Sequence, residues 1–112
     1  MGKRKKATGE RMVFLQLIQE RGNKSQISNK ELFGEEHFQW HWQFSHVLPK
    51  GLYSRFRLYD RNIVLMLPEE HVYVTEHEGT ARKNPLWQKY FALKEQLKQE
   101  YHDRKRVLPI GG

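Results

Sequence analysis

The amino-acid sequence predicts an α+β fold in one small domain that ends in a long helix. Three observations support this prediction. Apolar and polar residues alternate over 37–48, which is typical of a strand, and residues 63–67 form a second short apolar run. After Asn84, apolar residues recur every three or four positions, as they do on one face of a helix. A chain of 112 residues is long enough for a single modest core.

The N-terminal segment is predicted to consist of a basic arm and a helix. Residues 1–9 carry a run of lysine and arginine, and we expect a flexible arm there that attracts phosphates without specificity. Residues 10–21 are expected to form a helix, with Thr8 as a candidate N-cap and Gly22 as the stop. A buried strand is the alternative for this segment, because its apolar pattern is not cleanly helical.

The middle of the chain predicts a strand, a loop, a second strand and a helix, in that order. The first strand would cover residues 37–48 and end at Pro49. A basic loop over residues 49–61 separates it from the strand at 63–67. Pro68 suits the first turn of a helix, which we expect to end near His77 or Gly79.

The C-terminal helix has the clearest pattern. Asn84 is a candidate cap, Pro85 fits the first turn, and the helix is expected to run from about residue 85 to about 106. Its apolar stripe is expected to pack on the core or on a partner helix, and it consists of Leu86, Tyr90, Leu93, Leu97 and Tyr101. We therefore predict a single domain over residues 10–106, followed by a basic tail at 107–112.

Composition limits the chemistry that the chain can perform. The net charge of +7 favours anionic partners, with nucleic acid first among them. The absence of cysteine excludes disulfides, thiolate nucleophiles and cysteine-ligated zinc. No apolar run is long enough to span a membrane, so we expect no membrane partner, and the absence of cysteine fits a cytoplasmic protein.

Two histidines and an asparagine stand at the ends of the predicted strands and on the helix that follows. His46 closes the first strand, Asn62 opens the second, and His71 lies on the helix. Together these residue types suit phosphodiester hydrolysis. A neutral imidazole can take a proton from water, a divalent metal can bind a phosphate oxygen, and an amide can hold a loop. In the alternative interpretation, His46 is packed in the core, Asn62 caps a turn, and His71 is exposed on its helix.

The loop between His46 and Asn62 alternates cations with aromatic side chains. Its cations would suit a groove that holds a DNA backbone, although such residues also pair with nearby carboxylates. They are Lys50, Arg55, Arg57 and Arg61.

The segments SHVLPKG, RNIVLM and PEEH resemble the HNH endonuclease superfamily, whose core is the ββα-metal fold. The resemblance covers about residues 22–78, and phage-type members such as the Rap (NinG) recombination nucleases are nearest in pattern. It implies a DNA endonuclease with His46 as the general base, Asn62 as the brace of the loop and His71 as a ligand of Mg²⁺, Mn²⁺, Ni²⁺ or Zn²⁺. A phage-encoded member would act in the cytoplasm of its host.

Two features depart from that family pattern. Ser45 stands where HNH proteins usually have a metal-binding Asp or His, and His77, His41 or Asp60 are the other candidates for a ligand. The cysteine positions of the zinc knuckle found in many HNH proteins correspond to Ser25, Ser28, Leu67 and Glu70. The alternative function is therefore a catalytically decayed module that binds nucleic acid, or one that binds a protein partner or itself through the C-terminal helix.

Overall fold

The computed structural model describes residues 9–111, and it describes side chains for residues 9–103. The predicted basic arm, apart from Gly9, and the candidate cap Thr8 lie outside these residues. The helices are α1 (Glu10–Arg21), α2 (Pro68–Glu76), α3 (Glu78–Arg82) and α4 (Gln88–Gly111), and the strands are β1 (Phe44–His46) and β2 (Ile63–Leu65). Short 3-10 helices cover Trp40–Gln43, Ser54–Phe56, Asp60–Asn62 and Pro85–Trp87. The predicted mixture of helix and strand is confirmed.

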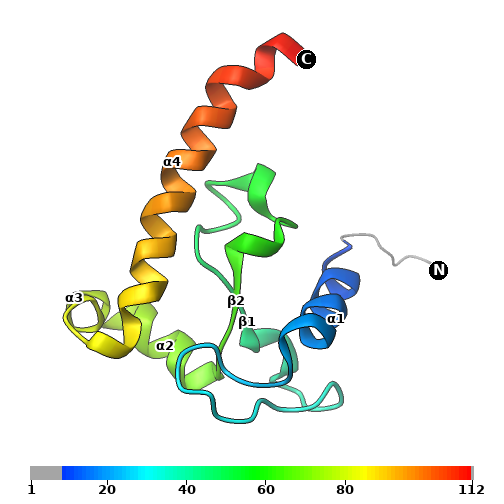
Figure 1. The fold of residues 1–112 in the computed structure, drawn as a ribbon. Coiled ribbons are helices and arrows are strands. Elements are labelled where there is room, and N and C mark those ends of the chain that lie inside the picture. Colours follow the sequence, from blue (N-terminus) through cyan, green and yellow to red (C-terminus); the bar gives the residue numbers. More distant parts are fainter. Residues whose placement is uncertain (1–8, 112) are drawn as a thin grey trace.

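The two strands form an antiparallel sheet between α1 on one side and α4 on the other (Figure 1). Successive residues of β2 face opposite ways. Ile63 and Leu65 pack in a cluster with Phe14 of α1, whereas Val64 packs in a cluster with Phe91 of α4. Because both faces of β2 are buried, its sequence is continuously apolar rather than alternating.

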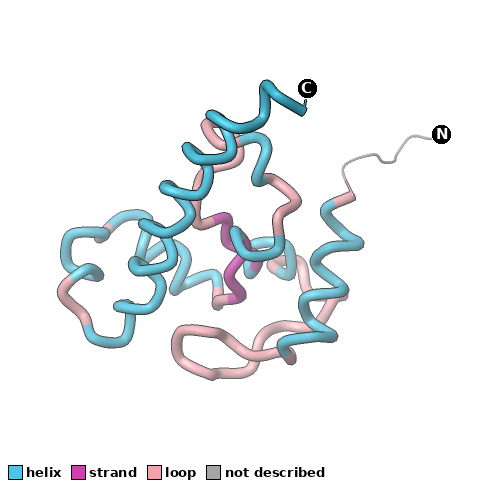
Figure 2. Tube along the Cα trace, turned by 45° about the horizontal axis from the view of Figure 1, so that its top comes forward, coloured by secondary structure: helices cyan, strands magenta, loops and turns pink. Residues whose placement is uncertain are grey.

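The prediction of a strand over residues 37–48 is wrong for most of its length. Only Phe44–His46 pairs with β2, and Trp40–Gln43 forms a 3-10 helix (Figure 2). The alternation was misleading because residues of one parity do not share a face. Trp40 is 2% exposed, but Trp42 is 54% exposed. The buried Gln43 side chain holds the turn, since its Oε1 accepts a hydrogen bond from the Phe33 amide at 2.6 Å.

The predicted helices are present, with changes at their ends. α1 covers the expected residues and follows Gly9, whose φ of 76° is left-handed. Asn84 caps the C-terminal segment by accepting a hydrogen bond from the Leu86 amide at 2.9 Å. α4 continues to Gly111 rather than ending near Arg106, because no glycine or proline directly after Arg106 stops it, and Pro109 falls within its last turn.

The apolar stripe of α4 packs on the core of its own chain. Tyr90 and Leu97 are buried there, and Leu93 and Tyr101 pack against the same cluster. Leu86 was wrongly included in the stripe, because it is exposed on the 3-10 turn before α4. None of the helices in the described part of the chain is long and apolar enough to cross a membrane.

The turn over residues 23–32 is joined to the start of α2 by a buried hydrogen-bonded serine. The Ser25 hydroxyl accepts from the amides of Ile27 at 3.0 Å and Ser28 at 3.1 Å, and it donates to Glu70 Oε1 at 2.6 Å. The same carboxylate oxygen accepts from the Leu67 amide at 2.8 Å. Ser25 and Glu70 occupy two of the four positions matched above to zinc-knuckle cysteines, and here a hydrogen bond joins them.

Removing the Ser25 hydroxyl should destabilise the fold. We expect Ser25→Ala to lower the free energy of unfolding by about 1–3 kcal/mol, because two amides and a carboxylate lose a buried partner. Ser28→Ala is the matched control in the same turn, since the Ser28 hydroxyl accepts only a long hydrogen bond of 3.4 Å from the Lys30 amide. Urea denaturation measures both changes, and equal midpoints for the two variants would contradict this role of Ser25.

Candidate active site

A cleft of about 560 Å³ runs along the open edge of β1. Four consecutive residues from Phe44 to Val47 line it, as expected for an edge, because β1 pairs with β2 on its other side only. α1 contributes Glu10, α2 contributes His71 and α4 contributes Lys94. The cleft therefore brings together His46, Ser45, Lys50 and His71 of the predicted site, and the alternative ligand candidate His41 lines it as well.

His46 is held by a backbone carbonyl of the loop that follows it. Its Nε2 lies 2.9 Å from the carbonyl oxygen of Arg57. A carbonyl can only accept a hydrogen bond, so Nε2 carries the proton, and in the neutral ring Nδ1 keeps its lone pair. The half-buried ring thus lines the cleft with one nitrogen fixed as a donor and the other open to accept a proton.

The surroundings of His46 favour its neutral form. Burial is the largest influence and lowers the pKa of His46 below its usual 6.5. The hydrogen bond to Arg57 opposes this shift, the positive charge of Lys50 adds to it, and the Glu10 carboxylate opposes it more weakly. The imidazole is therefore neutral at pH 7, which is the protonation state that a general base needs.

Asn62 is fully buried behind the cleft and joins the two ends of a loop. Its Oδ1 accepts from the Leu48 amide at 2.8 Å, and its Nδ2 donates to the carbonyl oxygens of Leu48 at 3.1 Å and Phe56 at 3.3 Å. Phe56 directly precedes Arg57, whose carbonyl holds His46. Asn62 touches the loop rather than the cleft, so it is a positioning residue.

His71 lies on the first half of α2, in the wall of the cleft. Its Nδ1 is 3.3 Å from the Trp42 carbonyl oxygen. This contact requires Nδ1 to donate, which leaves Nε2 as the acceptor nitrogen of the neutral ring. A second nitrogen that donates to a carbonyl is the usual arrangement of a metal-binding histidine.

Ser45 faces α4 instead of offering an open ligand. The side chain is 1% exposed. Its hydroxyl forms a hydrogen bond with the phenol of Tyr90, whose pKa is raised by burial. His77 is exposed at the end of α2, outside the residues that line the cleft, and its ring packs against Tyr73.

The donors in the cleft do not complete a metal site. Within residues 9–103, no group of three or more His, Asp or Glu side chains is placed to hold a metal ion. His71 offers one imidazole nitrogen, Ser45 is engaged with Tyr90, and the Glu10 carboxylate is paired with Lys50 at 2.9 Å. Metal dependence stays a prediction from the family resemblance.

The basic loop is divided between α4 and the cleft. The Arg55 guanidinium lies 4.4 Å from the centre of the Tyr101 ring, and Arg61 donates to Glu100 at 2.6 Å. These two cations attach the loop to α4. For Arg61, this contact is the alternative stated above, in which a loop cation pairs with a nearby carboxylate. Lys50 and Arg57 lie instead near Glu10, with Arg57 Nη1 at 3.9 Å from its carboxylate.

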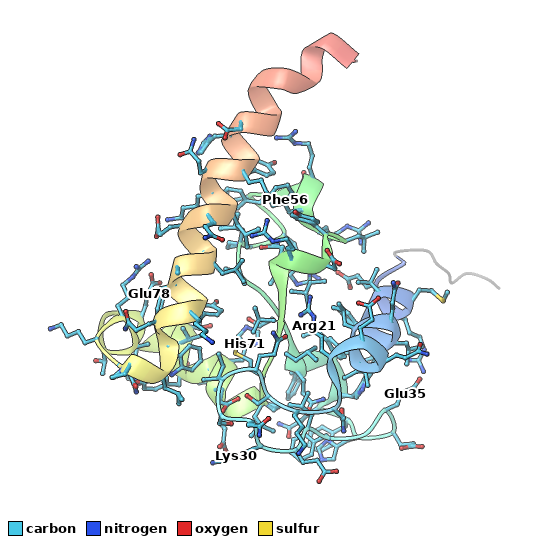
Figure 3. All side chains as sticks on the ribbon, viewed as in Figure 1. Arg21, Lys30, Glu35, Phe56, His71 and Glu78 are labelled. Carbon is cyan, nitrogen blue, oxygen red and sulfur yellow. The ribbon has the colours of Figure 1, made fainter. Side chains whose placement is uncertain are left out.

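The sequence pattern did not identify Glu10, Tyr90 or Lys94 as residues of the cleft. Glu10 had the position of an ordinary first-turn acid, and Tyr90 was assigned to the core stripe. Lys94 gave a usable signal, because it lies one turn after Tyr90 on a face that is otherwise apolar. Its side chain is only 18% exposed, and its Nζ lies 3.5 Å from the Glu78 carboxylate (Glu78 is labelled in Figure 3).

Comparison with protein-family models, with curated proteins and with solved structures gives no match to this chain. The family resemblance therefore depends on the sequence motifs alone.

Proposed function

We propose that the chain is an HNH-type endonuclease that hydrolyses DNA phosphodiester bonds, with His46 as the general base. The observation that carries this proposal is the hydrogen bond from His46 Nε2 to the Arg57 carbonyl. It leaves Nδ1 unprotonated on a ring that lines the cleft. The order β1, loop, β2, α2, with His46 and His71 in one cleft, also agrees with a ββα-metal core.

The chain's own residues supply the steps of hydrolysis. Nδ1 of His46 takes a proton from a water molecule, and the resulting hydroxide attacks the phosphorus atom. The bond from phosphorus to the leaving oxygen breaks, and that oxygen takes a proton from solvent. Lys50 and Lys94 line the same cleft, and each would exchange its carboxylate partner, Glu10 or Glu78, for the negative charge of the phosphate during the attack. The predicted metal ion would supply Lewis-acid stabilisation of the phosphate charge, with His71 as one of its ligands.

A decayed nucleic-acid-binding module is the second candidate. The burial of Ser45 against Tyr90 favours it, because the family's usual metal ligand at this position is missing. This candidate keeps the cations of the cleft and the fold, but it predicts that DNA binds without being cleaved.

Cleavage of plasmid DNA tests the proposal. We expect the wild-type chain to nick plasmid in Mg²⁺, Mn²⁺, Ni²⁺ or Zn²⁺. His46→Ala should cleave at least about 100-fold more slowly, because the general base is gone. The rate should rise with pH through a pKa below 6.5 and then stay level, since deprotonation of His46 creates the active form. His102→Ala is the control on the exposed side of α4. Binding of plasmid without cleavage, or cleavage that His46→Ala leaves intact, contradicts the nuclease assignment.

Metal dependence is tested with the same substrate. We expect EDTA to stop cleavage and His71→Ala to raise the Mn²⁺ concentration needed for half-maximal rate at least tenfold, because His71 is the predicted ligand and its Nε2 keeps a lone pair in the cleft wall. His77→Ala should leave that concentration unchanged, since His77 lies outside the cleft lining. Cleavage that persists in EDTA and depends on His46 would contradict the metal prediction while leaving the general base in place.

A further inference from the structure

A second groove, of about 740 Å³, lies beside the cleft and shares a wall with it. Trp42 and His71 line both spaces. The rest of the groove includes Lys30, Gln39 and Val72, and two of its lining residues, Lys30 and His71, are labelled in Figure 3. A ligand that occupies the cleft can therefore continue past Trp42 into the groove.

Trp42 is an exposed aromatic residue in the lining of this groove, and its exposed aromatic neighbour Phe38 lies outside the lining. Trp42 is 54% exposed and Phe38 is 77% exposed, and their ring centres are 6.2 Å apart in an edge-to-face arrangement. His37 extends the group, since its ring stacks on Phe33 at 3.9 Å and on Phe38 at 4.8 Å. Within the described residues, most of the surface of Phe38 and Trp42 is left open to solvent, which is typical of a binding surface.

The charges around the groove distinguish it from the cleft. Its polar residues are mixed, with Lys30 beside Glu31 and Glu69, so it has no clear attraction for phosphate. In the neighbouring cleft two lysines, Lys50 and Lys94, balance two carboxylates, Glu10 and Glu78, so the cleft disfavours a phosphate less than the groove does. The groove thus suits a flat, uncharged ring that is covalently attached to a phosphate in the cleft.

We propose that the groove binds an unpaired nucleobase next to the phosphate that lies at His46, with the base stacked on Trp42. Stacking on aromatic side chains tolerates any base, and the Gln39 amide can hydrogen-bond a base edge. Bases inside an intact duplex are stacked on one another and cannot enter the groove. The preferred substrate is therefore DNA with unpaired nucleotides beside the cleaved bond. This inference deepens the proposed function and rests on it for the position of the phosphate.

Tryptophan fluorescence tests the inference without cleavage. Trp42 is the exposed one of the three tryptophans, because Trp40 and Trp87 are each 2% exposed. In EDTA, a 12-nucleotide single strand should quench the fluorescence of the intact chain, and Trp42→Phe should abolish the quenching. In anisotropy titrations, Trp42→Ala should weaken binding of that strand about 5- to 150-fold, the range for one stacked base. Trp42→Phe should keep most of the affinity.

Two comparisons keep the result specific. Leu86→Ala removes an equally exposed apolar side chain outside both spaces and should change no affinity. Binding of a blunt duplex should change less than twofold in Trp42→Ala. An equal loss for duplex and single strand, no loss for either, or no binding by the intact chain overturns the inference.

The inference and the nuclease proposal can fail separately. His46→Ala should retain the single-strand quenching, because His46 lies outside the groove. Quenching by a chain that never cleaves DNA would leave the stacking site standing and remove the nuclease. The stacking site alone would be contradicted if cleavage depends on His46 but Trp42→Ala leaves the cleavage rate unchanged on both gapped and intact duplex.

Discussion

The buried amide of Asn62 is the constraint on which the rest of the site depends. It bonds to both backbone groups of Leu48 and to the carbonyl of Phe56, while the backbone of Asn62 accepts from the Val47 amide at 2.9 Å. Asn62, directly before β2, therefore holds the loop after β1 at two points: the beginning of the loop at Leu48 and a point near its middle at Phe56. An amide buried this way keeps its position because a lost partner inside the protein costs about 1–3 kcal/mol. The carbonyl that holds His46 belongs to the residue after Phe56, so the orientation of the imidazole follows from the clamp.

α4 connects this clamp to the cleft. Tyr101 of α4 packs edge-on against Phe56 with ring centres 4.9 Å apart, and the Arg55 guanidinium lies over the Tyr101 ring, 4.4 Å from its centre. Nearer the start of the same helix, Tyr90 forms a hydrogen bond with Ser45, and Lys94 lines the cleft. α4 thus supports the loop after β1, covers the face of β2 that carries Val64, and supplies the cation Lys94 to the cleft. The start of α2, which carries His71, is held separately by the hydrogen bond between Ser25 and Glu70.

Sequence reasoning predicted the elements that have strong local signals. α1, β2, α2 and α4 follow from capping residues, glycine or proline stops and apolar spacing, and the structure contains all four. The long strand at residues 37–48 failed because Gln43 finds its partners on Phe33, a tertiary contact that local alternation does not reveal. His46 and His71 were placed together by their spacing and do line one cleft. Glu10 and Lys94 were missed because they reach the cleft from helices distant in sequence, and Ser45 could not be assigned until its Tyr90 partner was known.

The tautomer and pKa of His46 provide the most direct test of this account. Long-range ¹H–¹⁵N NMR resolves both, with the His46 signals assigned by their absence from His46→Gln. In the wild-type chain we predict a neutral ring protonated at Nε2, because Nε2 donates to the Arg57 carbonyl. We also predict a pKa below 6.5, because burial lowers the pKa of His46. In a folded Asn62→Ala variant, the ring should populate both tautomers. A wild-type ring protonated at Nδ1, or a pKa at or above 6.5, would contradict the proposed general base.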